Sequence, residues 1–150
     1  MSELKHFYQT YIRSSADKIW QALTDPEFTV QYFHATRVQS SWQSGSTIEY
    51  LMPDDSVAVT GEVIECNPPS RLAITWQAKY SPELANEPPS RVVFEITELE
   101  DGVCRLSVTH DNFQPGSKTF EQIQPGWDPI LCSLKSLLET GSAMPIPQNL

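Results

Sequence analysis

Basic residues are scarce in this sequence. Lys and Arg together number 10, against 19 Asp and Glu, and the formal net charge is −9 at pH 7. The few basic residues are scattered along the chain, so the sequence lacks the positive surface that binds phosphate backbones or anionic lipid. We therefore expect neither nucleic acid nor a membrane as a partner. The acidity is typical of a surface charged for solubility, and it also suits a basic protein partner.

Long apolar runs and cysteine-rich patterns are also missing. No apolar run approaches the roughly 20 residues that a membrane-spanning helix needs. The first residues, MSELKHFYQTY, lack the order of charged, apolar and small residues that marks a secretory signal. The three cysteines (Cys66, Cys104 and Cys132) are widely spaced and odd in number, which argues against a disulfide framework. We therefore expect a cytoplasmic protein.

The motifs of several catalytic and cofactor-binding classes are absent as well. The sequence contains no HxxxH or CxxC spacing for a metal, and no GxSxG nucleophile turn. It contains neither GxGxxG nor a phosphate-binding loop with lysine. We therefore assign no catalytic residue, no metal ligand and no cofactor.

The segments that are present predict one α+β domain over residues 1–150. An aromatic and β-branched segment at 6–13 predicts a strand, and Ser14, Ser15 and Asp17 predict a helix start that follows it. Asp25, Pro26 and Glu27 restart a second short helix. Segments with alternating apolar and polar residues then predict six further antiparallel strands, at 38–42, 47–52, 56–66, 72–77, 91–99 and 103–110.

The C-terminal region predicts a long helix. Residues 126–141, GWDPILCSLKSLLETG, place Trp127, Ile130, Leu131, Leu134 and Leu138 on one stripe. Pro125 predicts a break at residues 124–126 before this helix, and residues 142–150 are expected to form a loosely ordered tail. A Pro-rich loop at 78–90 is long enough to be either a mobile flap or a tolerated insertion.

Four segments in this order resemble the START-like (SRPBCC) helix-grip superfamily, in particular the family of the activator of heat-shock-protein ATPase. The segments are IWQALTDPEFTVQYF (19–33), GEVIECNPPSRLAITW (61–76), RVVFEITELEDGVCRLSVTHDNF (91–113) and GWDPILCSLKSLLETG (126–141). The resemblance implies a curved antiparallel sheet of about seven strands around the C-terminal helix, often with a hydrophobic cavity between them. It implies no shared reaction and no shared catalytic residues.

The aromatic and apolar residues that face such a cavity are the candidate ligand-binding residues. Large aromatic side chains form the rigid walls typical of small-molecule pockets, and they also suit a solid core. His110, at the end of an inward-facing series with Leu106 and Val108, is the candidate polar anchor, and it also suits a structural role. The set comprises Trp20, Phe28, Tyr32, Tyr50, Met52, Trp76, Phe94, His110, Trp127, Ile130, Leu131 and Leu134.

Three functions follow as hypotheses. The first is binding of a small apolar, aromatic or lipid-like ligand between sheet and C-terminal helix, with the opening near residues 81–89 and 28–33. On this hypothesis Leu134→Trp should fill the cavity. The second is a co-chaperone-like regulator that binds a protein partner, and a homodimer is compatible with either. The third, which we rank below binding, is a cyclase or lyase that uses His110, so the sequence leaves open whether the protein is an enzyme.

Overall fold

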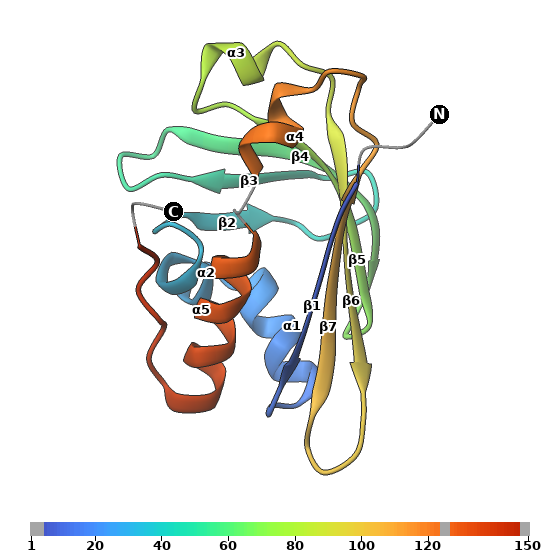
Figure 1. Ribbon diagram of the computed structural model, residues 1–150, viewed down its shortest axis with the longest axis vertical. Helices are drawn as coiled ribbons and strands as arrows, with labels where there is room; N and C mark the ends of the chain where they lie inside the picture. Colours follow the sequence, from blue (N-terminus) through green and yellow to red (C-terminus); the bar gives the residue numbers. More distant parts are fainter. Residues whose placement is uncertain (1–4, 124–126, 148–150) are drawn as a thin grey trace.

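The computed structural model of the protein describes residues 5–123 and 127–147. It has the predicted α+β helix-grip architecture, with seven strands and two short helices after the first strand (Figure 1). The elements in chain order are β1 (His6–Ile12), α1 (Ala16–Thr24), α2 (Pro26–Tyr32), β2 (Arg37–Ser40), β3 (Thr47–Leu51), β4 (Val57–Asn67), β5 (Arg71–Ala78), α3 (Pro82–Ala85), β6 (Ser90–Glu98), β7 (Cys104–Asp111), α4 (Lys118–Ile123) and α5 (Trp127–Thr140).

The two short helices begin where the polar residues predicted them. The Ser15 side chain accepts a hydrogen bond from the Lys18 backbone N–H, which caps α1. Asp25 caps α2 in the same way by accepting from the Glu27 N–H, and Pro26 occupies the first helical position, where no N–H is needed. Local side-chain chemistry therefore sets both helix starts.

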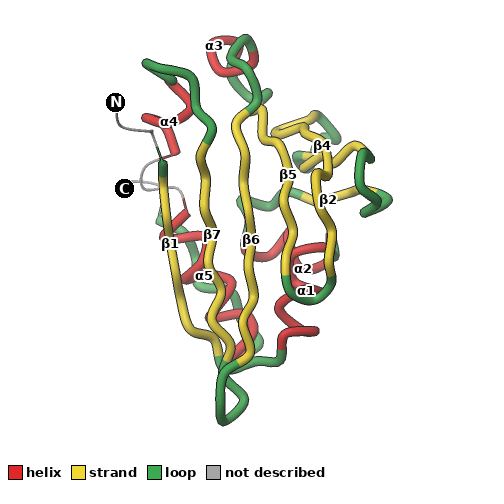
Figure 2. Tube along the Cα trace, turned by 90° about the vertical axis from the view of Figure 1, so that its right-hand side faces the viewer, coloured by secondary structure: helices red, strands yellow, loops and turns green. Residues whose placement is uncertain are grey.

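All seven strands form one antiparallel sheet in the order β1-β7-β6-β5-β4-β3-β2. The sheet curls strongly, so that β2, β3 and β4 run across β5, β6, β7 and β1 (Figures 1 and 2). Helices α1, α2 and α5 lie on the same side of it, inside the curl (Figure 1). One layer of helices therefore covers the concave face of the sheet.

The strand alternation places apolar residues on the concave face and polar residues on the other face. Val92, Phe94 and Ile96 of β6 are buried, as are Leu106, Val108 and His110 of β7. On the convex face, the Arg91 side chain bonds Asp111 at 2.8 Å and Arg71 bonds Glu95 at 2.8 Å. The predicted inward and outward sets of these two strands are confirmed.

Helix α5 fills the hollow of the sheet. Trp127, Ile130, Leu131 and Leu134 are buried, and burial of each such side chain contributes about 1.5–3 kcal/mol. Gly141, with a φ of +87°, ends the helix in the left-handed conformation that favours glycine. The predicted break at residues 124–126 lies outside the described residues.

The described part of the C-terminal tail runs back along α5. The Ser133 hydroxyl donates to the Met144 carbonyl oxygen at 2.7 Å. Ala143 and Ile146 are half-buried against the core. These contacts hold residues 142–147 to the domain.

The Pro-rich loop contains α3 and is tied to its neighbours by hydrogen bonds. The Gln77 side-chain amide of β5 donates to the carbonyl oxygens of Ala85 and Glu87. The buried Glu87 carboxylate accepts from the Ser117 hydroxyl and from the Lys118 N–H at the start of α4. Burial acts to raise the pKa of Glu87, but these hydrogen bonds outweigh it and lower the pKa overall.

None of the helices in residues 5–123 and 127–147 has the length and apolar character that a bilayer span requires.

Candidate functional site

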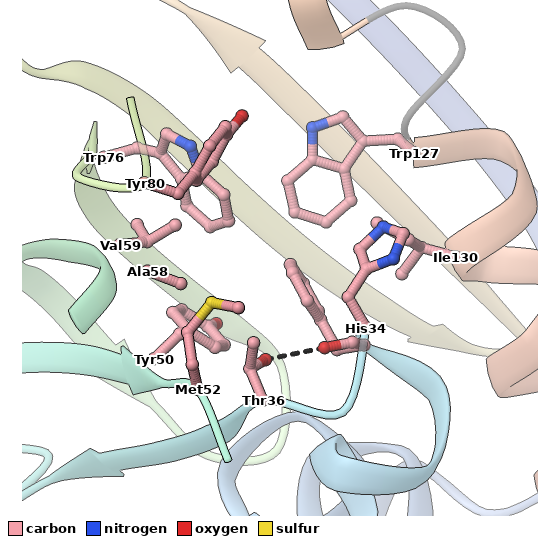
Figure 3. Close-up of a pocket in the computed structure, with 11 residues that line it drawn as sticks. His34, Thr36, Tyr50, Met52, Ala58, Val59, Trp76, Tyr80, Trp127 and Ile130 are labelled. Carbon is pink, nitrogen blue, oxygen red and sulfur yellow. Dashed lines mark hydrogen bonds between the residues drawn. The ribbon is translucent and has the colours of Figure 1, made fainter. Parts of the chain in front are cut away.

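A pocket of about 360 Å³ lies where the curled sheet, the start of α5 and the residues after α2 meet (Figure 3). The wall is mainly apolar and aromatic, and the described residues that form it include no Asp, Glu, Lys or Arg. The lining residues are Phe33, His34, Thr36, Tyr50, Met52, Ala58, Val59, Trp76, Tyr80, Trp127 and Ile130. The size and the lining are those of a small-molecule site.

Four aromatic rings from four different elements make up much of this wall. Phe33, at the end of α2, stacks on Tyr50 of β3 with ring centroids 4.9 Å apart. Trp76 of β5 lies 5.5 Å from Tyr50 and 5.4 Å from Trp127 of α5. Each of these rings therefore contacts at least one other ring of the wall.

An irregular turn after α2 brings Phe33, His34 and Thr36 into the pocket wall. His34 and Ala35 have φ angles of 52° and 59°, in the left-handed region, and these angles reverse the chain between α2 and β2. The Thr36 hydroxyl donates to the Phe33 carbonyl oxygen at 2.6 Å and closes the turn, as Figure 3 shows. The helical spacing of apolar residues ends with α2, so the sequence pattern gives no sign that these residues belong to the pocket wall.

A register shift in the sheet adds Ala58 and Val59 of β4. The pairing of β3 with β4 slips between Tyr50 and Leu51, and both Ala58 and Val59 are buried although they are consecutive. A bulge of this kind bends the strand and changes which side chains point inward. Simple alternation of inward and outward residues therefore fails at this point.

Five of the twelve predicted ligand-binding residues lie in the pocket wall. They are Tyr50, Met52, Trp76, Trp127 and Ile130. Six further wall residues were not among the predicted ones: Phe33, His34, Thr36, Ala58, Val59 and Tyr80. Tyr80 lies near the start of the Pro-rich loop and is 56% exposed, so it lies at the rim of the pocket. The rim residues Tyr80 and His34 directly adjoin the segments 81–89 and 28–33, which we predicted to flank the opening.

The other seven predicted residues lie outside the pocket wall. Tyr32 is buried between the two short helices, where its hydroxyl donates to the Ala22 carbonyl oxygen at 2.8 Å. Phe94 lies behind Trp127, with ring centroids 5.8 Å apart. Leu131 and Leu134 face solid core, and the half-buried Trp20 and Phe28 lie at its edge. The seventh residue is His110.

His110 lies outside the pocket wall and is linked by hydrogen bonds to two tryptophans of the wall, Trp127 and Trp76. The Trp127 indole N–H donates to His110 Nδ1 at 3.1 Å. Because Nδ1 is an acceptor, the ring proton is on Nε2, which donates to the Ser90 hydroxyl oxygen at 2.7 Å. The Ser90 hydroxyl donates in turn to the Trp76 carbonyl oxygen at 3.2 Å. Both ring nitrogens of His110 are therefore hydrogen-bonded within the protein. The expectation that His110 offers a polar anchor to a ligand inside the pocket is corrected: His110 instead positions residues of the pocket wall.

The protonation state of His110 follows from this network. Burial lowers the pKa of His110 to about 3, the electrostatic interaction with His6 adds to the lowering, and the interaction with Asp111 opposes it. A proton on Nδ1 would also face the Trp127 N–H, and two donors cannot bond one another. The ring is therefore neutral in the folded protein at pH 7.

Acidification should destabilise the protein through this histidine. In the unfolded chain an ordinary histidine binds its proton near pH 6.5, whereas folded His110 does so only near pH 3. The unfolded state therefore binds more protons between these values, and the free energy of unfolding should fall by about 2 kcal/mol from pH 7.5 to pH 5. Urea unfolding at several pH values measures this loss.

The control for the acid effect is His34→Asn, because burial of part of its ring also lowers the pKa of His34. Asparagine tolerates the left-handed backbone at this position. The variant should keep most of the pH dependence. A stability that stays constant from pH 7.5 to pH 5, or a loss that His34→Asn abolishes, would contradict the assignment to His110.

The comparisons with known proteins agree with this fold. The sequence profile of the family described as "Activator of Hsp90 ATPase homolog 1-like protein" matches residues 13–139. The comparison with curated proteins gave no significant match.

Solved structures share the architecture over most of the chain. Protein MLL2253 from Mesorhizobium loti is 22% identical with a TM-score of 0.75, and the match covers 90% of this chain and 96% of that one. The Aha1 dimer from Colwellia psychrerythraea is 20% identical with a TM-score of 0.71, covering 91% and 97%. An HSP90 activator from Plasmodium falciparum is 17% identical with a TM-score of 0.68, covering 83% and 88%. At these identities the likeness shows the fold.

Proposed function

The chain belongs to the family of Activator of Hsp90 ATPase homolog 1-like proteins, and we propose that it binds a small, largely apolar ligand in the pocket between sheet and α5. The observation that carries this proposal is the pocket itself, about 360 Å³ in volume and lined by four aromatic rings that contact one another. Small-molecule sites are typically concave, mainly apolar clefts of several hundred Å³. The volume and the lining of this pocket fit that description, which supports a small, largely apolar occupant.

Filling the pocket should abolish binding without unfolding the protein. Ile130→Trp adds a ring at the wall, whereas Leu134→Trp, one turn further along α5, adds the same ring to solid core. Wild type should bind the uncharged fluorescent probe N-phenyl-1-naphthylamine saturably, and Ile130→Trp should not. Leu134→Trp should instead lose about 1–3 kcal/mol of stability through overpacking. Probe titrations and urea unfolding of all three proteins measure both effects.

Leu134 is fully buried and lies outside the pocket wall. The expectation that Leu134→Trp would fill the cavity is therefore corrected. Equal probe binding by wild type and folded Ile130→Trp would contradict the proposal. So would an Ile130→Trp variant that loses as much stability as Leu134→Trp, since that would mean the space is already filled.

The family and two of the similar structures favour a second candidate function, regulation of an Hsp90-type chaperone. The net charge of −9 would support binding to a basic surface, and such binding weakens as salt screens the charges. The discriminating measurement is the ATPase rate of an Hsp90 chaperone with added wild type or Ile130→Trp. If both wild type and Ile130→Trp stimulate the ATPase, and salt reduces the stimulation, the function belongs to the charged surface of the protein and not to the pocket. Unchanged ATPase rates would reject this candidate function.

A further inference from the structure

Two polar atoms in the pocket wall have no hydrogen-bond partner within the described part of the chain. They are the hydroxyl of Tyr50 and the indole N–H of Trp76, on residues that are only 3% and 5% exposed. Every fully enclosed side-chain nitrogen or oxygen of the described residues is hydrogen-bonded. These two unpartnered atoms therefore touch space that is large enough for a water molecule.

The other polar groups of the inner wall are already engaged by the protein. The Trp127 indole N–H donates to His110, and the Thr36 hydroxyl donates to the Phe33 carbonyl oxygen. His34 and Tyr80 are exposed and lie at the rim. The described residues of the inner pocket therefore present two free groups able to donate a hydrogen bond and no charged group.

The electrostatics of the wall restrict what can occupy it. Burial raises the pKa of the Tyr50 hydroxyl, so it keeps its proton, and the indole N–H of Trp76 is a donor only. A carboxylate placed here would lose its hydration without a cation to replace it. A hydrocarbon would leave both donors without a partner, which is costly in a buried site.

We propose that the occupant is an uncharged, planar aromatic molecule with a carbonyl-type acceptor, which the Tyr50 hydroxyl or the Trp76 N–H bonds while its rings lie against the aromatic wall. The inference rests on the proposed function, and it adds the chemical class of the ligand. Figure 3 shows Tyr50 and Trp76 on the sheet side of the pocket, facing Trp127 and Ile130 of α5 across it.

Three tricyclic probes of one shape test this class: 9-fluorenone, which carries a carbonyl, fluorene, which lacks it, and fluorene-9-carboxylate, which is an anion. Equilibrium dialysis against the full chain measures each Kd. Fluorenone should bind about tenfold more tightly than fluorene, which corresponds to one net hydrogen bond. The carboxylate should bind more weakly than either uncharged probe.

Conservative variants identify the donor. Tyr50→Phe removes only a hydroxyl without a partner, so it should fold normally, keep its affinity for fluorene and lose most of the preference for fluorenone. Trp76→Phe is the corresponding variant for the second donor. Tyr11→Phe is the matched control, because Tyr11 is 47% exposed and lies outside this pocket; it should change neither Kd.

Each outcome decides between the two proposals. If none of the three probes binds, the ligand-binding function fails and this inference fails with it. If fluorene and fluorenone bind equally, or the carboxylate binds most tightly, the pocket binds ligands but the assigned class is overturned. A preference for fluorenone that survives in both Tyr50→Phe and Trp76→Phe would overturn the assignment of the donors.

Discussion

Replacing His110 with leucine should lower the free energy of unfolding by about 2–4 kcal/mol, although His110 lies outside the ligand pocket. Leucine cannot accept the hydrogen bond from Trp127 Nε1 or donate to the Ser90 hydroxyl, and both groups are buried. Leaving one buried donor without a partner costs about 1–3 kcal/mol, and the misfit of leucine in the imidazole site adds to this cost. Urea unfolding at pH 7.5, where wild-type His110 is neutral, measures the difference.

A double-mutant cycle separates the hydrogen bond from the change of shape. In a Trp127→Phe background the indole donor is already gone, so His110→Leu should cost about 1–2 kcal/mol less than it does in wild type. His34→Asn, at an exposed histidine, should change stability by less than about 0.5 kcal/mol. If His110→Leu costs the same in both backgrounds, the bond to Trp127 does not contribute to stability.

The regular parts of the fold could be predicted because local rules governed them. Ser15 and Asp25 marked helix starts by their capping chemistry, and the alternation in β6 and β7 fixed which side chains enter the core. The apolar stripe of α5 had to be buried against another large apolar surface, and the concave face of the sheet provides it. The resemblance to a helix-grip family supplied the connection between these elements.

The pocket wall was harder to predict because irregular backbone positions more than half of its described residues. His34 enters through two consecutive left-handed residues, Ala58 and Val59 through a register shift, and Tyr80 from a loop. None of these features has a periodic signal in the sequence. For His110 the inward direction was predicted, but its role was not. Its two ring nitrogens bond Ser90 and Trp127, which are distant in the sequence.

The positions of these wall residues depend in turn on a close approach of β4 to β5, which Gly61 permits. A Cβ atom at Gly61 would lie 1.9 Å from the Thr75 carbonyl oxygen and 2.7 Å from its carbonyl carbon. Both are backbone atoms, so no rotamer change relieves the clash. The neighbouring Glu62 N–H also donates to the Thr75 hydroxyl at 2.8 Å, which holds the strands together at this point.

Gly61→Ala should therefore cost more than about 3 kcal/mol, because β4 and β5 must separate locally and lose hydrogen bonds as well as packing. Gly102→Ala is the matched control: its φ is +74°, and no atom of the described residues beyond its two chain neighbours lies within 4 Å of the added Cβ. It should therefore cost only about 1–2 kcal/mol for the left-handed backbone. If urea unfolding gives equal losses in the free energy of unfolding for the two variants, β4 and β5 can separate locally at little energetic cost. Since β4 carries Ala58 and Val59 and β5 carries Trp76, any Gly61→Ala protein that still folds should also bind N-phenyl-1-naphthylamine more weakly, whereas Gly102→Ala should bind it as wild type does.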